Sequence, residues 1–132
     1  MSRSGYTDDI YCNWLLICWR GAVASAIRGK RGQQFLKELL SSLDAMPEKK
    51  LIRDELVAEG QFCTLGVIGH QRSIDMTGID PDNRDQVAAV FGIAPAMAAE
   101  IVYMNDEYYG RATPEERWQK MRDWVSEQIK SE

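Results

Sequence analysis

The chain has 132 residues, a formal net charge of −4 at pH 7, and 45% hydrophobic and 27% charged residues. This length predicts one domain, 1–132, with a core of its own, and the composition excludes an extensively disordered chain. The uncharged run near the start of the chain, Ile10–Trp19, is about half as long as a membrane-spanning helix, and we expect no membrane segment.

Cysteine use and the N-terminal residues indicate the compartment. An odd number of cysteines (Cys12, Cys18 and Cys63) is typical of reduced thiols in a cytosolic protein. Asp8 and Asp9 stand where a secretory signal would carry basic residues. We therefore expect the protein to work in the cytoplasm in which it is made.

Two helices are predicted in the first third of the chain. Thr7-Asp8-Asp9 can cap a helix that ends at Arg28-Gly29. Gly32 opens a second helix with an apolar stripe of one phenylalanine and four leucines, and Met46-Pro47 ends it. Glycines in the connection between the two helices are expected to supply positive φ angles.

Residues 50–63 allow either a short β-hairpin or a helix and a turn. Gly60 stands where a tight turn needs a positive φ angle, so the hairpin is favoured. A short helix is expected over Thr64–Arg72, ending at Ser73, with Ile74 folding back over it.

Three further helices are predicted after residue 80. The first starts at Pro81 and Asp82 and is stopped by Gly92, and Pro95 opens the second. The third begins with a capping box, Thr113–Glu116, that has proline at the first helical position. Together these segments predict a mainly α, or α+β, fold: a single compact helical domain of five to six helices with a small β-hairpin near residues 50–63.

Sequence motifs supply no catalytic or cofactor site. The segment RGKRGQ, residues 28–33, lacks the glycine spacing of a phosphate-binding loop. His70, the only histidine, follows Cys63 by seven residues, or about 10 Å on a helix, which is too far for a direct Cys–His pair. The cysteines also lack the spacing of a zinc site. We therefore predict no catalytic residue, no cofactor and no metal ligand.

Residues 87–93 resemble the first half of a helix-turn-helix. A recognition helix must then bring Arg, Lys, Asn or Gln to the base edges, but residues 94–100 are apolar apart from Glu100. A packed helical hairpin is the better interpretation of this segment.

Charge is divided unevenly along the chain. Residues 10–37 carry +5, and residues 75–107 carry −6. The two regions could be solvated faces that meet inside the monomer, or the acidic surface could bind a basic partner, or the basic stretch could bind nucleic acid or an acidic protein. Opposite charge on the two regions also permits a homodimer, with head-to-tail and two-fold self-association equally open. The basic residues are Arg20, Arg28, Lys30, Arg31 and Lys37.

A second group of candidate partner-binding residues is acidic or aromatic. Exposed tyrosines are favoured at protein interfaces, and two tyrosines stand beside Gly110. The candidates are Asp82, Asp85, Glu100, Asp106, Glu107, Tyr108 and Tyr109.

Four blocks of the sequence suggest a family. They are MSRSGYTDD at the start, WRGAVASAIRGKRGQQFL (19–36), EIVYMNDE (100–107) and TPEERWQKMRDWV (113–125). Over nearly its full length the chain resembles a family of small proteins encoded by tailed phages and prophages of proteobacteria. The resemblance implies expression in a bacterial cytoplasm, and small phage proteins of this size often bind a host protein, including components of antiviral defence.

Three hypotheses of function follow. The first is a phage or prophage accessory protein that binds a bacterial host protein or complex, such as an anti-CRISPR inhibitor. The alternative is a nucleic-acid-binding protein that uses the basic stretch 20–37. The second alternative is a small enzyme that uses Cys63 and His70.

Overall fold

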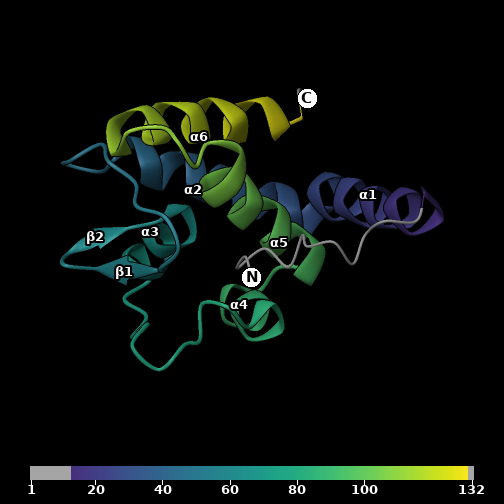
Figure 1. The fold of residues 1–132 in the computed structure, drawn as a ribbon, viewed down its shortest axis with the longest axis horizontal. Helices are drawn as coiled ribbons and strands as arrows, with labels where there is room; N and C mark the ends of the chain where they lie inside the picture. Colours follow the sequence, from purple (N-terminus) through teal and green to yellow (C-terminus); the bar gives the residue numbers. More distant parts are fainter. Residues whose placement is uncertain (1–12, 131–132) are drawn as a thin grey trace.

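The computed structural model describes residues 13–130, with side chains described from Cys18 onward. In this part of the chain, six α-helices, one π-helical segment and a two-stranded antiparallel sheet give a mainly helical fold with a small hairpin (Figure 1), as the sequence predicts. The expected cap at residues 7–9 and Cys12 lie outside the described residues. The elements are α1 (Asn13–Arg28), α2 (Lys30–Asp44), β1 (Val57–Ala58), β2 (Gln61–Phe62), α3 (Thr64–Gln71), α4 (Arg84–Phe91), α5 (Pro95–Tyr103), η1 (Met104–Tyr108) and α6 (Pro114–Gln128).

A single residue, Gly29, separates α1 from α2. Its φ is −67° and its ψ is 161°, which any residue can adopt, so the expected positive φ in this connection is wrong. The glycine that this region needs is Gly32, because a Cβ there would collide with the carbonyl oxygen of Ala26. α2 therefore begins at Lys30, two residues earlier than predicted, and packs closely against the end of α1.

The β-hairpin favoured by the sequence is confirmed. Val57 pairs with Phe62, and Ala58 pairs with Gln61. The two residues of the turn, Glu59 and Gly60, have φ angles of 53° and 77°. Positive φ at both positions is the requirement of the type I′ turn, whose twist matches that of the strands it joins.

The ends of α3 and α4 follow the predicted capping pattern with one shift. Ser73 has a φ of 58°, and the N–H of Ile74 donates to the carbonyl of Gly69 at 2.8 Å, so Ile74 folds back over α3 as expected. α4 starts at Arg84 and not at Pro81, because the side chain of Asn83 accepts from the first turn and serves as the N-cap. Gly92, with a φ of 71°, ends α4.

α5 is the central helix of the fold. Its residues 96–102 are all buried, and α1, α3 and α4 pack against it. A helix buried on all sides cannot enter a DNA groove, and α4 and α5, which meet at a bend of 105°, instead pack against each other. No single helix in the described chain is long and apolar enough to cross a membrane; α4 together with α5 and η1 meets that criterion only as a pair bent by 105°.

α6 lies along α2 on one side of the molecule (Figure 1). Both hydrogen bonds of the predicted capping box are present, between Thr113 and Glu116. The indole N–H of Trp118 donates to the carbonyl of Leu43 at 3.2 Å, which ties α6 to α2. One hydrophobic core runs through the described chain from Val23 to Val125.

Candidate functional site

Exposed cations gather where α1 meets α2. Arg28 ends α1, and Lys30 and Arg31 begin α2; we call these three residues the basic turn. All three side chains are exposed, and no carboxylate of the described chain lies within ion-pair distance of them. Lys37, two helical turns further along α2, is also exposed.

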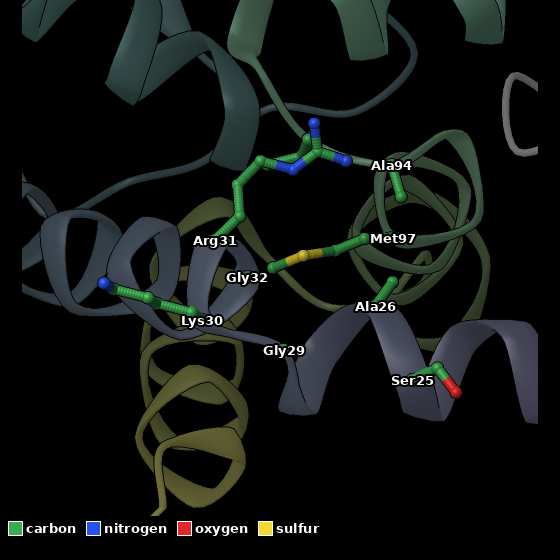
Figure 2. A pocket seen from close by; sticks show the side chains of 9 residues that line it. Ser25, Ala26, Gly29, Lys30, Arg31, Gly32, Ala94 and Met97 are labelled. Carbon is green, nitrogen blue, oxygen red and sulfur yellow. The ribbon is translucent and has the colours of Figure 1, made fainter.

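A hollow of about 220 Å³ lies beside the basic turn, between the start of α2 and the start of α5. Figure 2 shows Arg31 extending from α2 towards Ala94, while Lys30 points to the other side of α2. The side chain of Met97 reaches from α5 towards Gly32 and is completely buried, so it forms an apolar floor. The sequence carried no signal for this hollow, because its walls come from segments more than 60 residues apart.

The helix ends at this hollow add to its positive potential. No side chain caps the first turn of α2 or the first turn of α5. The N–H groups of a first helical turn have no partner within the helix, and they form the positive end of the helix dipole. In α5, however, Pro95 has no N–H, and the N–H of Met97 donates to the carbonyl of Ala94. The start of α2, with Arg31 beside it, therefore makes the hollow favourable for an anionic group such as a carboxylate or a phosphate.

Arg20 and Glu100 form an ion pair, in which Glu100 is buried and Arg20 is about half exposed. Glu100 of α5 is only 5% exposed, and both of its oxygens accept from Arg20 of α1, at 3.1 and 3.3 Å. Arg84 also reaches α1, with its guanidinium 5.1 Å from the ring centre of Trp19. The basic and acidic regions of the chain therefore meet here, inside the monomer, and they use these residues to dock α1 on α4 and α5.

Asp106 is also internal, which corrects its expected place on the surface. Its Oδ1 accepts from the backbone N–H of Asp54 at 3.1 Å and from the side-chain amide of Asn105 at 2.7 Å. Asn105 in turn accepts from the N–H and the hydroxyl of Thr64. The π-helical turn η1 carries both residues, and it directs these two consecutive polar side chains into the fold.

The structural role of Arg117 was missed in the sequence. This buried guanidinium donates to four main-chain carbonyls, those of Leu51, Asn105, Gly110 and Ala112, at 2.8 to 3.1 Å. Burial lowers its pKa, and repulsion from Arg53 acts in the same direction. Its spacing of four residues from Met121 and seven from the buried Trp124 places it on the core face of α6, and that spacing is the signal that could have identified it.

The other predicted partner-binding residues remain at or near the surface. Tyr108 is 63% exposed, and the ring of Tyr109 meets it edge-on with ring centres 4.9 Å apart. Burial raises the pKa of Tyr109, with smaller contributions from Tyr108, Glu127 and Asp123. The exposed acidic candidates are Asp82, Asp85 and Glu107.

Cys63 and His70 lie at the two ends of α3. Cys63 is buried and caps the helix by accepting from the N–H of Gly66 at 3.4 Å. His70 is exposed, and its ring lies on Phe62 with centres 4.7 Å apart. His70 lines a groove of about 770 Å³ between the end of α2 and the β-hairpin, and neither Cys63 nor Asp75 lines that groove. The geometry gives this pair no support as a nucleophile and base.

No group of three or more His, Cys, Asp or Glu side chains in residues 13–130 is arranged to hold a metal ion. Comparison with protein-family models, with curated proteins and with solved structures finds no match.

Proposed function

We propose that this chain is an accessory protein of a phage or prophage that acts by binding a bacterial host protein or complex through its basic turn. An inhibitor of antiviral defence, such as an anti-CRISPR protein, is the most specific form of this proposal. The observation that carries it is the basic turn itself: three exposed cations without a carboxylate partner in the described chain, in a protein of net charge −4.

The electrostatics of the basic turn support an acidic partner. Arg28, Lys30 and Arg31 repel one another, and a bound carboxylate would relieve this repulsion. The neighbouring hollow offers a place for one such group between Arg31 and the uncapped start of α2. Complementary charge of this kind raises association rates and selects the orientation of the partner.

A protein partner fits the described surface better than a nucleic acid does. Nucleic-acid binding depends on several cations along one surface, because each neutralised phosphate contributes to affinity. Arg20, at the start of the predicted basic stretch, is paired with Glu100, which shortens that stretch. The exposed acidic residues of the 75–85 loop and the net charge of −4 also disfavour a polyanion.

Capture from a bacterial lysate tests the proposal. We expect tagged wild-type protein to retain a specific host protein at physiological salt, and we expect Arg31→Glu to reduce its recovery by about tenfold or more. Arg111→Glu is the matched control, since Arg111 is also exposed and the change in charge is the same. Equal recovery with the two variants would contradict the assignment of the basic turn.

Nucleic-acid binding is tested separately by fluorescence anisotropy with labelled duplex and single-stranded DNA. The proposal predicts no measurable affinity above about 0.2 M salt. If no host protein is captured, and DNA binds with an affinity that falls steeply with salt and is lost in Arg31→Glu, the nucleic-acid alternative replaces the proposal.

A further inference from the structure

A larger hollow lies at the other end of α2, just after the helix stops. Its volume is about 770 Å³, within the range of about 300–1,000 Å³ that is common for ligand sites. Met46 and Pro47 line one side, and Phe62 and Val67 line the other. The hollow is therefore an apolar groove between the end of α2 and the β-hairpin.

The rim of this groove is acidic. Glu48 and Glu59 are exposed on it, and neither makes an ion pair with another residue of the described chain. The lining cation, Lys50, lies 3.8 Å from Glu115 outside the groove. We call the groove with these two carboxylates the acidic groove.

Two further groups define the chemistry of the acidic groove. His70 lies on the ring of Phe62, so an aromatic surface is present beside the carboxylates. Lys49 donates to the carbonyls of Asp44 and Met46, at 2.9 Å each, and thus neutralises the negative end of α2. The attraction for a cation therefore comes from the side chains of Glu48 and Glu59.

The basic turn and the acidic groove occupy opposite ends of one helix. α2 has 15 residues, which separates the two surfaces by about 20 Å. A guanidinium can pair with a carboxylate and lie on an aromatic ring, while its stem covers apolar surface. The basic turn thus has the positive charge and the long side chains that can bind in the acidic groove.

We infer that the acidic groove binds the basic turn of a second copy of this chain. Arg28, Lys30 and Arg31 of one copy lie against Glu48 and Glu59 of the next, with Phe62 beneath an arginine. Each copy carries both surfaces, so the contact either continues head to tail from copy to copy or forms twice in a two-fold dimer. This inference rests on the proposed function only in that both use the basic turn.

Sedimentation velocity of the purified protein tests the inference without any host component. We expect the average mass to rise with concentration at low salt and to return to that of the monomer as salt screens the contact. Glu48→Gln/Glu59→Gln and Lys30→Gln/Arg31→Gln are each expected to weaken self-association by about tenfold or more. Glu55→Gln/Glu127→Gln, which removes two other exposed carboxylates, is expected to associate like the wild type.

Mixing the two deficient variants gives the decisive measurement. The groove variant keeps its basic turn, and the turn variant keeps its acidic groove, so an equimolar mixture can form one intact contact. We expect a 1:1 dimer that does not grow further. A wild type that stays monomeric at low salt, or a mixture that stays monomeric, would overturn the inference.

The same variants separate this inference from the proposed function. Glu48→Gln/Glu59→Gln leaves the basic turn intact, so it should still capture the host protein after it has lost self-association. Self-association without any captured host protein would contradict the proposed function alone. Capture of a host protein by a strictly monomeric wild type would contradict the inference alone.

Discussion

Single buried polar residues hold the irregular part of this fold together. Arg117 and Asn105 bind main-chain carbonyls of two irregular segments, residues 51–52 and residues 105–112. A buried carbonyl that loses its donor costs about 1–3 kcal/mol. These buried polar side chains therefore contribute strongly to the stability of the irregular segments.

Replacement of Arg117 should be severe. We expect Arg117→Ala to lower the free energy of unfolding by about 3 kcal/mol, because the carbonyls of Leu51, Asn105 and Ala112 lose this donor together, while that of Gly110 keeps its bond from Arg53. Arg117→Lys should recover only part of this loss, since an ammonium lacks the planar fork of the guanidinium. Urea denaturation measures the difference, and Arg111→Ala, an exposed arginine, is the control.

The ion pair between Glu38 and Arg72 gives a prediction about pH. The hydrogen bond from Arg72 lowers the pKa of Glu38 below its ordinary value of 4.5 in the folded protein. A lowered pKa stabilises the fold above the unfolded pKa, and this contribution is lost as the pH falls through the folded pKa. Both side chains are about one-third exposed, so the effect at pH 7 should be under about 1 kcal/mol.

Denaturation of wild type and Glu38→Gln across pH measures this contribution. The wild type should be the more stable protein at pH 7, and the difference should disappear in acid once Glu38 is protonated. A difference that stays constant down to pH 2 would mean that packing, and not charge, accounts for the effect of the substitution.

At the scale of elements, helix ends and close crossings determine the arrangement. The capping box at Thr113 starts α6, and Gly32 lets α2 approach the end of α1. The cap and the glycine differ in the range of the contact that each one serves. A cap is a local contact between residues three apart, whereas the need for Gly32 arises only where two helices meet.

Loss of the cap should weaken α6. We expect Thr113→Ala to lower the free energy of unfolding by about 1 kcal/mol, because the N–H of Glu116 loses its acceptor. Thr113→Ser should keep nearly all of the stability, since it retains the hydroxyl. Equal stability of the alanine and serine variants would show that the cap contributes nothing.

A methyl group at Gly32 should disturb the α1–α2 crossing. The Cβ of Gly32→Ala would overlap the Ala26 carbonyl, a backbone atom that cannot rotate away, so we expect a loss of about 1–3 kcal/mol. Gly21→Ala is the control, because a Cβ at Gly21, within α1, meets no atom. Greater helix propensity should make that variant at least as stable as the wild type.

At the scale of the whole molecule, some residues of the basic and acidic regions pair with each other in the folded chain, and others stay exposed on the surface. Arg20 and Glu100 are used to dock α1 against α5. The basic turn remains exposed at one end of α2, and carboxylates remain exposed in the 75–85 loop and on the acidic groove. An uneven electrostatic field of this kind affects the association of the protein with partners more than it affects the stability of the fold.

Salt should therefore change binding much more than stability. We expect the association rate with the captured host protein to fall about tenfold or more between low and physiological salt, because a Debye length of about 8 Å screens the basic turn. The urea midpoint of the free protein should change little over the same range. Surface plasmon resonance and urea denaturation measure the two quantities.

The sequence by itself determined the features that depend on near neighbours. The capping box at Thr113, the helix stop at Gly92 and the hairpin turn at Gly60 all follow from residues a few positions apart. Glu59 in the same turn was not predicted to adopt a positive φ, because that angle is disfavoured for a non-glycine residue. Local preferences thus predicted where most elements begin and end.

Only the tertiary structure decided which charged residues lie inside. Glu100 meets Arg20 across 80 positions of the chain, and Arg117 reaches Leu51 across 66. Burial of a charge is tolerated where partners converge on it. The spacing of Arg117 on α6 indicates that it faces the core, but the sequence does not indicate which distant groups it meets there. The hollow beside the basic turn and the acidic groove arose in the same way, because their walls meet only when the helices pack.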